Sequence, residues 1–180
     1  MFAYCIAAAH LNLPHQLIDH LMVSNTQVGG EGWNFVDNLT KNVGSDHVCE
    51  IMTNTDVDSL HSPASTVPLP TVIHYCQRYI IGQWFFGKRR VPKNYFTCDH
   101  PLLKVPPMDL DEIEYKIAPG EADSETNRKG LHGHQSLRES FMICSLTRIM
   151  NEASLFFKEN GCPDEKINTE KSMNMHTDLF

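Results

Sequence analysis

Several features that would assign this chain to a common protein class are absent from its sequence. Its apolar runs all fall short of the ~18 residues that a membrane-spanning helix needs. No basic residues precede the apolar start of the chain, as they would in a secretory signal peptide. The phosphate-binding glycine loop, the dinucleotide-binding glycine pattern and the Gly-x-Ser-x-Gly turn of serine hydrolases are missing too. The sequence therefore contains none of these familiar motifs that would indicate an enzymatic activity.

The chain also lacks an excess of positive charge and closely spaced cysteines. Its net charge is −7, which argues against a nucleic-acid-binding protein. No two of the six cysteines form a Cys-x-x-Cys motif, so a zinc knuckle or a thioredoxin-type site is not expected. Disulfides would suit a luminal protein, and free thiols would be equally ordinary in a cytosolic one. The triplet Asn38-Leu39-Thr40 is a glycosylation sequon and adds slight support to a secretory location.

What is present suits one domain or part of a larger one: 180 residues, of which 41% are hydrophobic. Residues 2–11 and 135–158 have helical patterns, and the second carries an apolar stripe at three- and four-residue spacing from Leu137 to Phe156. Gly161 and Pro163 should end that helix. Because the chain opens inside an apolar helix with no N-cap, we expect the fold to begin upstream of Met1.

The strongest strand pattern is "VPLPTVIHYC", residues 67–76. Before it, residues 37–66 are polar and rich in turn formers, which predicts an insertion or mobile loop. Asp56 and Asp58 lie in this stretch and resemble a DxD metal motif, although no apolar strand precedes them, so we interpret them as a solvated acidic turn. The polar residues 163–180 predict a disordered tail.

The segment "TVIHYCQRYIIGQWFFGKRR", residues 71–90, is the best candidate site. His74 lies where the strand should end, the place where α/β folds bind ligands, and an imidazole there could bind a divalent metal. Lys88 and Arg89 could bind a diphosphate, and Gly82 would let backbone approach it. The alternative is that His74 is an ordinary hydrogen-bonded histidine and that the basic run, Arg90 included, is a solvated face.

A second histidine pair, His132 and His134, could share a metal if it lay on a strand. The pair is flanked by glycines just before the predicted helix. We therefore interpret it as a flexible segment that precedes the helix.

Three segments resemble the C-terminal half of plant and algal hydroxyproline O-arabinosyltransferases and the related peptidyl-serine galactosyltransferases. They are the opening "MFAYCIAAAHLNLPHQLIDHLMV", then "VIHYC" followed by "IGQWFFGKRR", and finally "SLTRIMNEASLFF". They cover about half of the chain and occur in the family's order. The resemblance implies an α/β fold that is the C-terminal part of a GT-A-like domain, spanning residues 1–162 and incomplete on its own.

The implied activity is a metal-dependent glycosyltransferase in the Golgi or ER lumen. It would use Mn²⁺ or another divalent cation, a UDP-sugar donor and a hydroxyproline or serine of a secreted protein, with any membrane anchor outside this chain. His74 would be a metal ligand, and Lys88, Arg89 and Gly82 would bind the diphosphate. The family's early DxD motif is not matched here, since Asp56 and Asp58 lie in the wrong order. In a luminal protein, Cys76 and Cys98 would flank the site and could be joined.

Residues expected to contact the sugar or the acceptor are Trp33, Glu31 and Trp84. An exposed Trp33 in a glycine-rich loop could stack on a sugar face, or it could fill the edge of the core. The rival hypothesis for the chain as a whole is a non-catalytic α/β binding or interaction module that keeps the aromatic cleft without the nucleotide-binding half.

Overall fold

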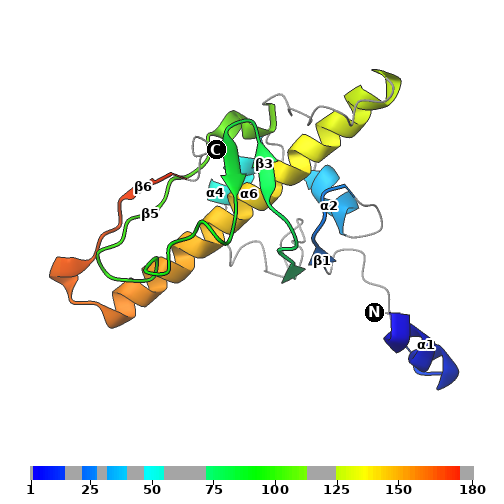
Figure 1. Cartoon of the computed structure of the whole chain (residues 1–180), viewed down its shortest axis with the longest axis horizontal. Helices are drawn as coiled ribbons and strands as arrows, with labels where there is room; N and C mark the ends of the chain where they lie inside the picture. The colour runs from blue at the N-terminus through cyan, green and yellow to red at the C-terminus, as the bar shows by residue number, and fades with distance from the viewer. Residues whose placement is uncertain are drawn as a thin grey trace.

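The computed structural model describes residues 2–14, 22–27, 32–39, 47–54, 72–112 and 125–174 (Figure 1). In these ranges it forms a small mixed α/β domain with short strands. The elements are α1 (Phe2–His10), β1 (Met22–Val23), α2 (Trp33–Asp37), α4 (Val48–Asn54), β2 (Val72–Ile73), β3 (Tyr79–Ile81), β4 (Trp84–Phe86), β5 (Leu102–Leu103), the 3-10 helix η1 (Met108–Glu112), α6 (Glu125–Gly161), the 3-10 helix η2 (Asp164–Lys166) and β6 (Lys171–Met173).

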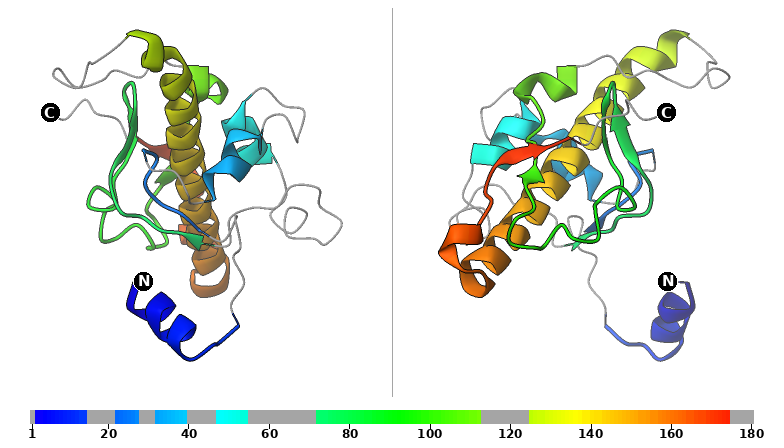
Figure 2. Two further views of the ribbon diagram at one scale, coloured as in Figure 1. Left: turned by 90° about the vertical axis from the view of Figure 1, so that its right-hand side faces the viewer. Right: turned by 60° about the vertical axis from the view of Figure 1, so that its left-hand side comes forward.

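Helix α6 is the axis of the domain, and α2, α4, β3, β4, β5 and η1 pack against it, while α1 lies apart from it (Figure 1). The hairpin β3–β4 covers one side of α6 while α2 and α4 cover the opposite side (Figure 2, left). Residues 139–145 of α6 are consequently buried all round the helix. The predicted helices at 2–11 and 135–158 are confirmed as α1 and as part of α6, which ends at Gly161 as expected.

The described strands form three separate two-stranded pairs. β1 and β2 are parallel, with Met22 opposite Val72, and β5 and β6 are also parallel. β3 and β4 form an antiparallel hairpin whose turn contains Gly82 at φ 55°, a left-handed conformation that glycine adopts without steric cost. The strand predicted at 67–76 is therefore only two residues long within the described part, because β1 offers only a two-residue partner.

The second half of the predicted α6 stripe is wrong. Ile149 and Phe156 are 50% and 70% exposed, whereas the polar residues Asn151, Ser154 and Lys158 face inward and are buried. The spacing of the apolar residues predicted that the side with Ile149 and Phe156 would be buried. The structure reverses it because the chain that packs there, residues 95–104 and 168, offers backbone carbonyl and N–H groups that need polar partners.

Two stretches that were predicted to be irregular contain regular structure. Within the polar stretch 37–66, Val48, Cys49, Ile51 and Met52 of α4 pack into the core, so the prediction of a loop is wrong for residues 48–54. The prediction of a disordered tail is wrong for residues 163–174, which contain η2 and β6. Pairing of β6 with β5 supplies the backbone partners that the polar tail sequence could not indicate.

The disulfide predicted between Cys76 and Cys98 is also wrong. Cys98 is bonded to Cys162, and a second disulfide joins Cys49 of α4 to Cys144 of α6. Cys76 is a free, exposed cysteine. Cys76 and Cys98 are close in sequence, but the disulfides join residues that α6 brings close in space.

Candidate functional site

Lys88 lies against Tyr75, the residue that follows His74. The Lys88 backbone N–H donates to the Tyr75 hydroxyl at 3.2 Å, and the Lys88 Nζ lies 5.3 Å from the centre of the tyrosine ring. The hydroxyl in turn donates to the Phe86 carbonyl at 3.4 Å. The β3–β4 hairpin folds the chain back and produces these contacts, so the start of the basic run is anchored beside the end of β2.

His74 directly follows β2, at the strand end where the sequence predicted it. Its backbone N–H donates to the Val23 carbonyl at 2.9 Å and extends the pairing of β1 with β2. Exposure alternates along this stretch: Val72, His74 and Cys76 are exposed, while Ile73 and Tyr75 are half-buried. Successive side chains of an extended chain point to opposite faces, so the alternation places His74 and Tyr75 on opposite faces of this stretch. Lys88 lies on the Tyr75 side.

Of the remaining residues of the candidate site, the arginines lie on the surface beside Lys88 and the glycine does not. Arg89 and Arg90 are exposed in the turn after β4, which the Arg90 N–H closes by donating to the Gly87 carbonyl at 2.8 Å. Gly82 lies at the opposite end of β4, in the hairpin turn, so the two glycine-containing turns do not form one loop. The structure thus brings Lys88 and Arg89 together and separates Gly82 from them by the length of β4.

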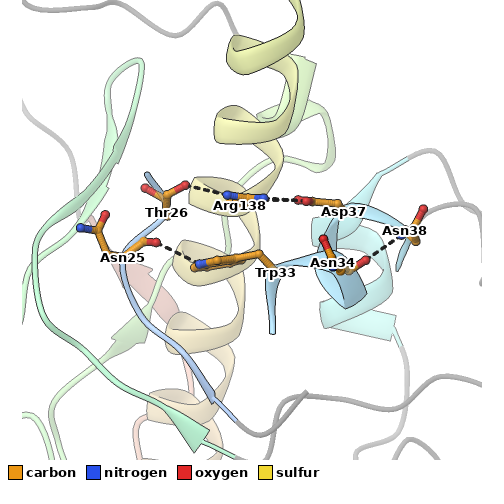
Figure 3. Close-up of polar contacts among 7 residues, drawn as sticks. All are labelled: Asn25, Thr26, Trp33, Asn34, Asp37, Asn38 and Arg138. Carbon is orange, nitrogen blue, oxygen red and sulfur yellow. Dashed lines mark hydrogen bonds and ion pairs between the residues drawn. The ribbon is translucent and has the colours of Figure 1, made fainter. Parts of the chain in front are cut away.

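The two tryptophans are buried and do not offer exposed rings. Trp33 is 1% exposed, its indole N–H donates to the Asn25 carbonyl at 2.9 Å, and the Arg138 guanidinium lies 5.3 Å from its ring (Figure 3). The interpretation of Trp33 as an exposed sugar platform is therefore wrong, and the core-edge alternative holds because α6 covers the ring. Trp84 is 9% exposed within the core cluster, so it does not wall an open cleft.

Other predicted positions fall where less is described. Glu31 and the pair Asp56 and Asp58 lie outside the described residues. His132 and His134 lie within α6, so the flexible segment predicted there is wrong: the helix starts earlier, at Glu125.

Among the described carboxylates, Glu139 has the most strongly shifted pKa, and it was not among the predicted site residues. Glu139 is 2% exposed, and its carboxylate accepts from the Thr26 hydroxyl at 2.6 Å and from the Ile80 N–H at 2.9 Å. Burial raises the pKa of Glu139 to about 7, an effect that these two hydrogen bonds only partly offset. Glu139 is two residues from both Leu137 and Phe141, so it lies on the side of the helix opposite the predicted apolar stripe, and no sequence pattern indicated its burial.

Arg138, the neighbour of Glu139 on α6, also binds the turn that contains Thr26. Its Nε and Nη2 donate to the two carboxylate oxygens of Asp37 at 2.8 and 2.7 Å, and its Nη1 donates to the Thr26 carbonyl at 3.1 Å (Figure 3). Arg138 and Glu139 thus hold the Thr26 turn onto α6 through its carbonyl and its hydroxyl. These contacts fix the turn at Thr26 and the end of α2 against α6.

A hollow of about 220 Å³ lies away from the predicted site, between α6 and the paired strands β5 and β6, here called the β5–β6 arm. Its lining includes Thr147, Arg148 and Asn151 of α6 and Lys171 of β6. Two of its polar side chains are already engaged: Arg148 donates to Glu152 at 2.6 Å and Asn151 bonds to β5. The rest of the lining is largely apolar and includes Val105, Cys144 and Leu155.

The described residues do not assemble a metal site by themselves. No group of three or more His, Cys, Asp or Glu side chains within the described ranges is arranged to hold a metal ion. His74 could supply one imidazole nitrogen, and any further ligands would come from outside these ranges. A search of the described helices for one long and apolar enough to cross a bilayer found none.

The fold and site define a small mixed α/β domain with a basic turn anchored at a strand end. Comparison with protein-family models, with curated proteins and with solved structures found no significant match to the chain.

Proposed function

We propose that this chain is the C-terminal portion of a GT-A-type glycosyltransferase that moves a sugar from a UDP-sugar to hydroxyproline or serine of secreted proteins. The observation that carries the proposal is the assembly of the three segments that resemble the family. β1, from the first segment, pairs with β2 of the second, and α6, which contains the third, packs against β3 and β4. Two of the segments therefore pair as β1 and β2, and the helix that contains the third packs against the hairpin that follows β2.

The chemistry of the basic turn supports a diphosphate ligand. Lys88 is exposed, its backbone N–H is bonded to the Tyr75 hydroxyl, and its ammonium group lies over the tyrosine ring, so its charge is favoured beside the end of β2 before a ligand arrives. A preorganised cation stabilises the charge that develops on a leaving diphosphate, at little reorganisation cost. Arg89, exposed beside it, could add a forked contact to phosphate oxygens.

The two disulfides support a luminal location. Disulfides persist in the secretory pathway and are rare in the reducing cytosol. His74 remains the proposed metal ligand, with Mn²⁺ as the proposed ion, although it faces the side of this stretch opposite Lys88, so the structure does not bring the two into one cleft. Because His74 alone cannot hold the ion, this part of the proposal depends on ligands upstream of, or outside, the described ranges.

The test is UDP release from a UDP-sugar with a hydroxyproline- or serine-containing peptide, using the longest chain that the gene encodes. Lys88→Ala should lower turnover by about 10²–10³-fold, the usual cost of removing one preorganised stabilising group. Lys88→Arg should restore only part, since a guanidinium fork differs from a point charge. Lys93→Ala, an exposed lysine in the next turn, is the matched control and should keep full turnover.

Tyr75→Phe separates anchoring from charge. It removes the hydroxyl that bonds to the Lys88 N–H while keeping the ring, so turnover should fall less than in Lys88→Ala.

His74→Ala should raise the Mn²⁺ concentration needed for half-maximal turnover. Unchanged turnover in both Lys88→Ala and His74→Ala, with the fold intact, would contradict the site. A folded full chain that neither binds the UDP-sugar nor transfers the sugar would favour the non-catalytic module instead.

A further inference from the structure

Asn38 is accessible in the folded protein. It follows the last residue of α2, is exposed, and lies on the side of α2 away from Arg138 and α6 (Figure 3). Its side-chain Nδ2 donates to the Asn34 carbonyl at 2.7 Å, a contact that is itself exposed. A group attached to this nitrogen would extend into solvent and would displace no core side chain.

Asn38 also belongs to the one Asn-x-Ser/Thr triplet in the 180 residues, Asn38-Leu39-Thr40. The middle residue Leu39 is fully buried, which anchors the triplet while its asparagine faces outward. The sequon is the recognition signal for N-glycosylation in the secretory pathway. The two disulfides indicate independently an oxidising compartment of the kind in which that modification occurs.

We propose that Asn38 carries an N-linked oligosaccharide. The proposal rests on the luminal part of the proposed function and not on the transferase activity. The co-reactant is a lipid diphosphate-linked oligosaccharide used by the glycosylation enzyme of the host cell. The Asn38 Nδ2 forms a bond to the sugar C1 and loses one proton to a base, while the C1–oxygen bond breaks and the lipid diphosphate leaves with the electron pair.

The experiment expresses the full gene in eukaryotic cells and treats the protein with an amidase that removes N-linked glycans. The untreated protein should migrate as a heavier band that the enzyme shifts down, and the released site should be found as aspartate at position 38 by peptide mass spectrometry. Asn38→Gln and Thr40→Ala should each abolish the shift, and Thr40→Ser should retain it.

Asn160 provides the matched control, because it is also exposed but is not followed by the Ser or Thr of a sequon. The third residue of Asn160-Gly161-Cys162 is a cysteine that is bonded to Cys98. Asn160→Gln should leave the shift unchanged. A shift that persists in Asn38→Gln overturns the proposal. So does an unshifted protein whose Cys98–Cys162 disulfide has formed, and this result leaves the luminal location standing. An unshifted protein with reduced cysteines overturns the proposal together with the luminal location.

Discussion

At the scale of single residues, Glu139 links local charge to the stability of the fold. Its carboxylate joins α6 to β3 and to the turn after β1, and burial raises its pKa from 4.5 to about 7. A carboxyl whose folded pKa is raised stabilises the fold in its protonated form. That stability is fully present below pH 4.5 and is lost as pH rises to about 7.

We therefore expect Glu139→Gln to remove a pH dependence. From pH 4.5 to about 7, the free energy of unfolding of the native protein should fall relative to that of Glu139→Gln. The relative change should be on the order of 3 kcal/mol at most, at 1.36 kcal/mol per pKa unit. Urea unfolding at a series of pH values measures it. Glu152→Gln, at an exposed glutamate paired with Arg148, is the control and should leave the slope unchanged. Parallel curves for the native protein and Glu139→Gln would contradict the assignment.

At the scale of elements, the C-terminal half of α6 binds the β5–β6 arm through polar side chains. The Asn151 Oδ1 accepts from the Leu103 N–H at 2.9 Å and from the Tyr95 hydroxyl at 2.6 Å, while its Nδ2 donates to the Leu103 carbonyl at 3.0 Å. Lys158 is buried and donates to the carbonyls of His100 and Asn168. One helix face thus supplies the partners that an edge strand would otherwise find in a wider sheet.

Asn151→Ala should detach this arm locally. It leaves the buried N–H and carbonyl of Leu103 without these partners, and each unsatisfied buried group costs about 1–3 kcal/mol. We expect a lower free energy of unfolding and faster amide hydrogen exchange at Leu103 and in β6 than in β3. Asn160→Ala, on the exposed side of the same helix, should change neither. Equal exchange rates in Asn151→Ala and the native protein would show that the arm is held by other contacts.

At the scale of the whole molecule, two disulfides connect distant parts of the chain through α6. Cys49–Cys144 joins residues 95 positions apart, and Cys98–Cys162 joins residues 64 apart. Cross-links that close long loops restrict the unfolded chain most, although the measured effect varies. Within the described residues each sheet has two strands, so the domain gains much of its long-range connection from α6 and from these bonds.

Replacing both Cys49 and Cys144 with alanine should lower the free energy of unfolding by about 2–5 kcal/mol. Chemical denaturation of the oxidised protein measures the loss. Cys76→Ser removes a free, exposed thiol and should be neutral. Non-reducing peptide mapping checks the pairing itself. Recovery of a peptide that joins Cys76 to Cys98 would restore the pairing that the structure excludes.

Much of the candidate site was predictable because it depends on local patterns. β-branched and aromatic residues indicated a strand that ends near His74. The turn at Gly82 was not predicted, because that glycine was assigned to the approach of a diphosphate. The contact between Tyr75 and Lys88 was not predictable, because it forms only once β3 and β4 fold back as a hairpin. The alternation of exposure that separates His74 from Tyr75 likewise depends on which face of β2 the core covers.

The sequence by itself determined the existence of α1 and α6 and the C-terminal end of α6, since helix formation depends on propensity and on residues three and four apart, and Gly161 and Pro163 stop α6 locally. Only the tertiary structure decided which face of α6 is buried beyond Met150, which cysteines pair, and that Trp33 and Glu139 lie inside. These outcomes depend on what packs against each side chain. Residues 95–104 present backbone polar groups to α6, and therefore Asn151 and Lys158 turn inward while Phe156 faces water.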